Sequence, residues 1–463
     1  MTITLDTQLD VASQVLDLVR DVAGPAAEAE VAVERTELAL TRFANSYIHQ
    51  NVADAVTSVR LRLHLDGRTA AGSTTVTGAL RDLVERTVAA SRLSPADPGW
   101  PGLAPPAPAA TAGTVDEPTA HASPDERAAR VRAFVDATAG LMAAGFCRSL
   151  YLSSAFANSA GQSLSGATSE AAMDGIARHN GADGVARMAS TRLADVDGAV
   201  LGARAAAKAR ASTDAVELPP GRYEVVLEYG AAIDLLSMLA IYGFNGKAVA
   251  ERRSFLRPDE AQFDPAVTLV DDATAPGAIG LPFDSEGTPS RRVVLVDRGV
   301  SRTACHDRRT AHQLGTGSTG HALPGAATYG PIALNLTLLP NGDGTPVSEV
   351  DGPVADTAVA ALVADVPRGL LVTDSWYTRA LDPRTLVVTG LTRNGVWLIE
   401  NGEVTRPVQN MRFTQSYVEA LAPGAVLGVG SALVAHPADW RFDSFAAPAV
   451  RLASWNYTGG ASG

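Results

Sequence analysis

Histidines and carboxylates are the residues of this chain that could bind a metal ion and activate water. A zinc hydrolase needs two or three neutral imidazoles or carboxylates that converge on the ion, and a nearby carboxylate that accepts a proton from the bound water. None of the eight histidines is followed by glutamate, so the sequence has no His-Glu signature of a zinc helix. His306 and His312 lie six residues apart, which is a rotation of about 240° on a helix, so they cannot chelate as a helical pair.

Two segments carry side chains that could act as nucleophiles. Gly315-Thr-Gly-Ser-Thr-Gly320 has the composition of an anion-binding nest, but it matches neither the Gly-x-Ser-x-Gly elbow nor the lysine-containing phosphate loop. Cys305-His306-Asp307 contains three reactive side chains, yet neighbours on a strand point to opposite faces and cannot form a hydrogen-bonded triad. We therefore expect no catalytic residue in either segment.

The helices and strands that the sequence predicts around these residues indicate an α+β protein. Apolar side chains at helical spacing predict helices over residues 9–22, 79–91, 127–144 and 198–211. Ser123 and Glu126 have the spacing of a capping box before the third helix. Alternating patterns predict strands in the first half over residues 30–33, 37–43, 59–65, 69–76, 150–158 and 162–168. The strand over 59–65 is expected to be half-buried, with Arg60, Arg62 and His64 on its polar face.

Leu218-Pro-Pro-Gly221 separates this half from one that is poorer in helix. Short strand-like runs dominate there, over residues 292–297, 332–339, 386–392 and 395–400. We therefore expect an N-terminal mixed α/β domain over residues 1–217 and a mainly antiparallel β domain over 218–463. The Pro-rich insert over 94–124 contains eight prolines and is predicted to be a loosely ordered surface excursion or linker.

Composition excludes some classes of function. A formal charge of -12 argues against a nucleic-acid-binding surface, because neutralising phosphates requires an excess of Lys and Arg. The two cysteines, Cys147 and Cys305, have no spacing of a metal or redox motif and indicate a reducing compartment. The first residues lack the basic and apolar segments of a signal peptide, so we expect a cytoplasmic protein without membrane contact.

Several motifs of the second half follow one another in a specific order. They are Arg222-Tyr-Glu-Val-Val-Leu-Glu228, Leu235-Leu-Ser-Met-Leu-Ala-Ile-Tyr-Gly243, Asp271-Asp272, Pro282-Phe-Asp-Ser-Glu-Gly287, Asp307-Arg-Arg-Thr-Ala311 and Ser318-Thr-Gly320. This order resembles the TldD/TldE (PmbA) family, once called modulators of DNA gyrase. The resemblance implies metallopeptidases that work as paired subunits, with the two-domain fold expected above.

The resemblance also implies which kind of subunit this is. In TldD-type members the apolar helix carries His-Glu-x-x-x-His, and a cysteine near the C-terminus is a further zinc ligand. Here the three helix positions are Ser237, Met238 and Tyr242, and the last hundred residues contain no cysteine. The resemblance therefore implies a TldE-like subunit that binds no metal, with zinc supplied by a TldD-like partner. The implied substrates are small peptides or peptide-like natural products, including antibiotics. The pair of subunits would hydrolyse their peptide or amide bonds.

We predict that this chain contributes a substrate cleft or a subunit interface rather than catalytic residues. The residues expected to line it are Arg308, Ser318, Thr319, Gly320, Trp376, Tyr377 and Arg412. Guanidinium groups bind carboxylates in a bidentate manner, and aromatic and Arg side chains are favoured at interfaces. A surface or interdomain ion pair for Arg308 and Arg309, and a simple glycine-rich turn at 315–320, stay open as alternatives. Trp397 is expected in the core.

Two other functions remain open from the sequence. The chain could be a non-enzymatic binding or scaffold homodimer that has no role in peptide hydrolysis. It could also be an independent hydrolase whose metal site is relocated to His306, His312 or His321 together with Asp307.

Overall fold

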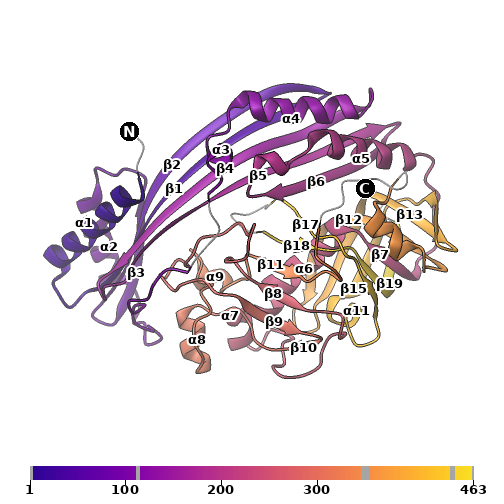
Figure 1. The fold of residues 1–463 in the computed structure, drawn as a ribbon. Helices are drawn as coiled ribbons and strands as arrows, with labels where there is room; N and C mark the ends of the chain where they lie inside the picture. The colour runs from indigo at the N-terminus through magenta and orange to yellow at the C-terminus, as the bar shows by residue number, and fades with distance from the viewer. Residues whose placement is uncertain (1–3, 111–114, 346–353, 438–443, 461–463) are drawn as a thin grey trace.

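Long strands in the first 190 residues form an arched antiparallel sheet, and the rest of the chain lies against one face of it (Figure 1). The computed structural model describes residues 4–110, 115–345, 354–437 and 444–460. The strand order is β3-β2-β1-β4-β5-β6. The strands are β1 (Glu28–Ala44), β2 (Tyr47–Leu65), β3 (Arg68–Thr74), β4 (Met142–Asn158), β5 (Ser163–His179) and β6 (Ala182–Ser190). The strands predicted over 30–33 and 37–43 form one strand, because β1 pairs with β4 without interruption.

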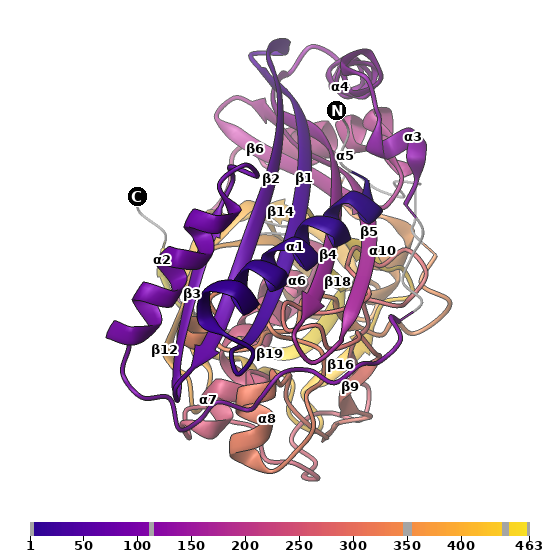
Figure 2. The same cartoon turned by 90° about the vertical axis from the view of Figure 1, so that its left-hand side faces the viewer.

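Helices cover the outer face of this sheet (Figures 1 and 2). They are α1 (Leu5–Ala23), α2 (Leu80–Leu93), α4 (Pro124–Ala137) and α5 (Gly198–Ala211). The Ser123/Glu126 capping box is present at the start of α4. The predicted helix over 127–144 is too long, because Ala139 and Gly140 take positive φ angles of 51° and 86° and end it before β4 begins.

The inner face of the sheet is buried against the second half of the chain. Phe156 and Leu164 of this face pack with Phe283, which comes from the second half. Arg60 and Arg62, which were expected on a polar face, also point to this side and form ion pairs there. The alternation predicted the strand, but the polar residues face another part of the protein instead of solvent.

Two further sheets make up the second half, which confirms the α+β fold class. In the larger one, β12, β7, β19, β15 and β13 pair in turn and β13 pairs back with β12, so five strands close into a ring. Its strands are β7 (Gly221–Leu227), β12 (Arg368–Asp382), β13 (Val387–Glu400), β14 (Glu403–Pro407), β15 (Met411–Ser416), β16 (Val426–Val429) and β19 (Val450–Gly460). The predicted strands over 386–392 and 395–400 form the single strand β13, which begins one residue later than predicted.

The smaller sheet has the order β10-β9-β8-β11-β18-β17. Its strands are β8 (Leu269–Asp271), β9 (Val293–Asp297), β10 (Val300–Ser301), β11 (Leu336–Leu338), β17 (Val434–Ala435) and β18 (Ala446–Ala447). The helix α6 (Tyr229–Met238) shares one apolar core with both sheets. Shorter helical segments are α3 (Glu117–Ala120), η1 (Leu193–Asp195), η2 (Leu239–Gly243), α7 (Gly246–Ala250), α8 (Arg308–Leu314), α9 (Ala326–Tyr329), α10 (Thr357–Val363) and α11 (Tyr417–Ala420). No helix within the described ranges has the length and apolar character of a membrane span.

The Pro-rich insert differs from its prediction. Residues 94–110 run from α2 along the first sheet and past α8 (Figure 2), and they make specific contacts. The Trp100 ring stacks on His64 at a centroid distance of 4.8 Å, and Asn158 donates a hydrogen bond to Ala104 O at 2.8 Å. Residues 111–114 of the insert lie outside the described residues. Polar and aromatic contacts therefore hold this segment on the first sheet, and it needs no apolar core of its own.

Candidate functional site

The helix that lacks the metal ligands consists of α6 and the π turn η2. Phe244 N donates a hydrogen bond to Leu239 O at 2.8 Å, which is the i→i+5 contact of a widened turn. On a regular α-helix, residues five apart are rotated by about 140°. The wider turn brings Ser237 and Tyr242 nearer to one face. The backbone thus suits a His-Glu-x-x-x-His spacing although the ligands are absent from the sequence.

The three side chains at these positions serve local structure. Ser237 Oγ donates to Asp234 O at 2.8 Å, within the helix. Met238 and Tyr242 are half-buried and pack against the core that α6 shares with both sheets. Each of the three side chains thus contributes to the local structure or the packing of α6 and η2.

Asp234, which was not predicted from the sequence, is the ionisable residue on this half-buried face of α6. Its Oδ1 accepts a hydrogen bond from Thr378 Oγ1 at 2.6 Å, and its Oδ2 accepts one from the Tyr417 hydroxyl at 3.0 Å. Burial raises the pKa of Asp234 to about 6, although both hydrogen bonds oppose the shift. The lone carboxylate in an apolar helix was the available signal for it.

Replacing Asp234 with asparagine is expected to flatten the pH dependence of stability. Because the pKa of Asp234 is about 6 in the folded protein and near 3.8 ordinarily, its contribution to stability is present below about pH 4. That contribution is lost as the pH rises through 6, by on the order of 3 kcal/mol. Urea denaturation at pH 4.5 and 7.5 should detect about 2 kcal/mol of this difference, with the exposed Asp17 replaced by asparagine as the control. The same pH dependence in wild type and the Asp234 variant would contradict the assignment.

The motif Pro282–Gly287 docks into the inner face of the first sheet. Phe283 packs on Phe156, and Gln162 Nε2 donates to Gly287 O at 2.9 Å. Gly287 has a φ of 73°, and a Cβ there would lie 2.2 Å from the Phe156 ring, so only glycine fits. The motif therefore fastens the second half of the chain to the first.

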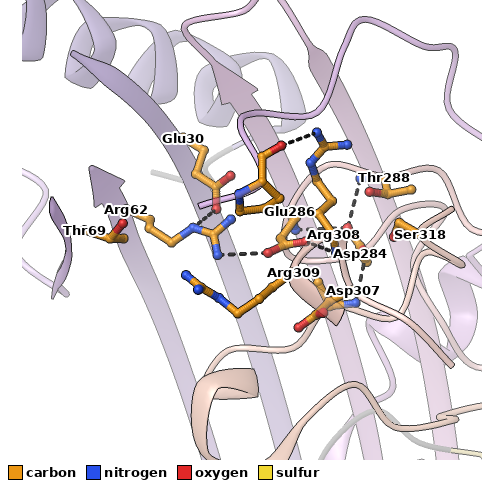
Figure 3. A network of polar contacts seen from close by, with 12 residues as sticks. Glu30, Arg62, Thr69, Asp284, Glu286, Thr288, Asp307, Arg308, Arg309 and Ser318 are labelled. Atoms are coloured by element: carbon orange, nitrogen blue, oxygen red, sulfur yellow. Dashed lines mark hydrogen bonds and ion pairs between the residues drawn. The ribbon is translucent and has the colours of Figure 1, made fainter. Parts of the chain in front are cut away.

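Buried charges surround this motif (Figure 3). Arg62 lies between Glu30, at 2.7 Å, and Glu286, at 2.9 Å, and its guanidinium also lies over the Trp100 ring. Burial raises the pKa of Glu30 to about 7 despite the attraction of Arg62. Burial and the charge of Glu286 also raise the pKa of Asp284 to about 7. The network couples the charge of these carboxylates to the packing of the two halves.

Arg308 and Arg309 connect α8 to the Pro-rich insert. The Arg308 side chain donates to Gly102 O and Pro101 O, both at 3.3 Å. Arg309 binds Asp97 in a bidentate manner at 2.9 and 2.7 Å, and this hydrogen bonding lowers the pKa of Asp97 to about 2. For Arg309 the interdomain ion pair is thus the alternative that the structure supports. A role of Arg308 in the substrate cleft stays a prediction.

The segment 315–320 is a hydrogen-bonded loop beside His306. Ser318 Oγ donates to His306 O at 3.1 Å, and Thr319 Oγ1 accepts from His306 N at 2.6 Å. These contacts match the alternative of a turn held by hydroxyl groups. Gly320 nevertheless lines a cavity between the two halves, so the loop also shapes an interdomain space.

The residues considered for a relocated metal site have other roles. Asp307 caps α8, where its Oδ1 accepts from Thr310 N at 2.7 Å. His312 is exposed on α8, and burial lowers the pKa of His306 to about 4. Among the described residues, no three His, Cys, Asp or Glu side chains form a group that could hold a metal ion.

His321 instead forms a buried pair with Asp271. Its Nε2 lies 2.9 Å from Asp271 Oδ1, and its Nδ1 lies 2.9 Å from Thr319 Oγ1. Burial alone would lower the pKa of His321, but its hydrogen-bonded partner Asp271 raises it well above its ordinary value. The pair lines the same cavity as Gly320.

Trp376 and Tyr377 lie on the exposed part of β12. They are 53% and 59% exposed, and Arg393 and Arg379 lie over their rings at 4.3 and 3.9 Å. Thr378, the next residue, bonds to Asp234, so this surface adjoins the half-buried face of α6.

Apart from Arg412, the residues predicted to line a cleft or an interface fall into two regions. Trp376 and Tyr377 belong with α6, whereas Arg308 and the loop 318–320 lie at the interdomain side. Arg412 is exposed on β15, in register with Leu391 of β13. Trp397 is 1% exposed, which confirms the expected core position.

The family models match most of the second half and part of the first. The PmbA/TldA metallopeptidase C-terminal domain matches residues 220–459, which is more than half of the chain. The PmbA/TldA metallopeptidase domain 1 matches residues 29–91.

Two individual relatives have low sequence identity to this chain. A metalloprotease of Methanocaldococcus jannaschii is 22% identical over 206 residues, or 44% of this chain and 42% of that protein. The metalloprotease TldD homolog of Haemophilus influenzae is 25% identical over 235 residues, or 49% of this chain and 45% of that protein. The chain thus spans less than half the length of the curated relatives it matches. The crystal structure of TldE from Thermococcus kodakarensis shares the fold, with a TM-score of 0.84 at 18% identity over 97% of this chain and 100% of that chain.

Proposed function

The chain belongs to the TldD/TldE (PmbA) metallopeptidase family, and from this membership we propose that it is a TldE-like subunit without a metal site of its own. It would pair with a zinc-bearing, TldD-like partner, and the pair would hydrolyse peptide or amide bonds of small peptides or peptide-like natural products. One observation carries the proposal. The helix α6 continues into the π turn η2, and Ser237, Met238 and Tyr242 stand where TldD-type members carry His, Glu and His.

In such a pair, zinc bound by the partner would lower the pKa of its water and polarise the substrate carbonyl. This chain would enclose the cleft and hold the substrate, which excludes bulk water from the reacting bond. The exposed Trp376 and Tyr377, beside the α6 face, are the surface that we assign to the partner or the substrate. Both cysteines are free and buried, which fits the cytoplasmic location that we also propose.

Mixing the chain with a TldD-like chain of the same genome tests the proposal. We expect one complex in size-exclusion chromatography with light scattering, and peptide hydrolysis at least about tenfold faster than with either chain alone. A partner in which the motif glutamate is replaced by glutamine is the control, since it should pair without activity. Absence of both the complex and the gain in activity would overturn the proposal in favour of a scaffold protein.

A further inference from the structure

A cavity of about 120 Å³ separates the inner face of the first sheet from the second half of the chain. Ala32, Leu152 and Phe156 line it from the sheet, and Leu281 and Phe283 line it from the docking motif. Drug-sized ligands occupy pockets of roughly 300–1,000 Å³, whereas one water molecule needs only about 10–15 Å³. The space therefore suits a group of the size of one amino-acid residue, with apolar walls on both sides.

One buried hydrogen-bond acceptor and one buried donor, in two residues that line this cavity, have no hydrogen-bond partner among the described residues. Asn335 is 7% exposed, and its Oδ1 is a buried acceptor without a hydrogen-bond donor among the described residues. Arg60 Nη2 is a buried donor that likewise has no acceptor in the part of the chain that the structure describes. Buried polar atoms are normally hydrogen-bonded, so each indicates a missing partner. A fitting ligand must offer both an acceptor and a donor.

Asp284 and Asp271, two of the three acidic residues that line the cavity beside Glu34, are already bound by the protein. Asp284 accepts three backbone N–H bonds, from Glu286, Thr288 and Ala322. Asp271 accepts from His321 and from Asn335 N.

The cations of the cavity are less fully engaged. Arg60 Nη1 lies 3.6 Å from Glu34, a loose ion pair, and Arg291 adds a second guanidinium at the wall, with one bond from Nη2 to Ser318 O at 3.2 Å. An anionic acceptor on the ligand therefore has guanidinium groups to bind, and a carboxylate matches their geometry.

We propose that this cavity holds the carboxyl-terminal residue of a peptide, with an apolar side chain against the wall that Ala32, Leu152 and Leu281 help to form. The peptide carboxylate would bind Arg60, and the amide N–H of the same residue would donate to Asn335 Oδ1. This inference rests on the proposed function and names the end of the substrate that the TldE-like subunit recognises.

Titration calorimetry with the isolated full chain tests this inference separately from pairing. N-acetyl-leucine and the tripeptide Ala-Ala-Leu are expected to bind, and N-acetyl-leucinamide at least about tenfold more weakly, because it lacks the carboxylate. Arg60→Met should weaken binding of the acids at least about tenfold and leave the amide unchanged, while Asn335→Leu should weaken both. Arg81→Met, on exposed α2, is the matched control with unchanged binding.

Three results would overturn the inference. The first is the absence of saturable binding up to about 10 mM, which corresponds to only about 3 kcal/mol of binding free energy. The second is equal binding of the acid and the amide, and the third is binding of free leucine without binding of the tripeptide. If Arg60→Met does not fold, Arg60→Lys keeps the charge without the planar fork and should bind the acids with intermediate strength. Since these measurements use one chain, their failure leaves the pairing with a TldD-like partner to be decided by the mixing experiment.

Discussion

Replacement of Arg62 with methionine is expected to lower the free energy of unfolding by about 3–5 kcal/mol. Glu30 and Glu286 are 5% and 4% exposed, and Arg62 is the cation between them, at 2.7 and 2.9 Å. Without it, two buried carboxylates would face each other at the junction of the two halves. Urea denaturation at neutral pH measures the loss. The loss should be smaller at pH 5, because burial raises the pKa of Glu30 to about 7 and this carboxyl group is then protonated.

Two further variants separate the network from general effects of losing an arginine. Arg86→Met removes an exposed ion pair with Asp82 on α2 and should cost no more than about 1 kcal/mol. Combining Arg62→Met with Glu30→Gln and Glu286→Gln should recover part of the stability, since no uncompensated charge remains. Equal losses for Arg62→Met and Arg86→Met would show that the buried carboxylates do not depend on Arg62.

Replacement of Trp397 with alanine is expected to cost about 3–5 kcal/mol of unfolding free energy. The ring is 1% exposed in the core beside β7 and α10, and its Nε1 donates to Ala211 O at 3.1 Å, at the end of α5. The substitution leaves a cavity and removes a contact between the first sheet's helices and the closed ring of strands. A shift of the urea midpoint measures the effect.

Trp376→Ala is the matched variant for a tryptophan at the surface. Since Trp376 is 53% exposed, its removal should change stability by no more than about 0.5 kcal/mol. If Trp376 contacts the TldD-like partner as proposed, the same change should weaken the complex at least about tenfold. Loss of stability as large as for Trp397→Ala would contradict the surface role.

Features with a local cause could be predicted from the sequence. The helix over 198–211 has the predicted bounds, because its spacing, its Asp197 cap and its small residues are all contained in the segment. The helix predicted over 127–144 is wrong at its end. Its apolar pattern continues into β4, while the positive φ of Ala139 and Gly140 breaks the backbone.

Features that depend on distant partners could not be predicted. Arg60 and Arg62 looked like a solvent-facing stripe, and only the docking of Pro282–Gly287 shows that this stripe lies between the two halves. The Pro-rich insert has no periodic pattern. Its Asp97 pairs with Arg309, which lies 212 residues further along the chain. The cavity likewise joins Arg60, His321 and Asn335 from separate segments. Composition describes none of these pairings.

Zinc content per chain, measured by mass spectrometry after dialysis against metal-free buffer, tests the central claim most directly. The purified chain alone is expected to retain less than about 0.1 zinc per molecule, and its complex with a TldD-like partner about one zinc per pair, since tightly held zinc needs a full ligand set. Retention of about one zinc by the isolated chain would contradict the account. The chain would then have a zinc site of its own, although Ser237, Met238 and Tyr242 replace the residues of the metal helix.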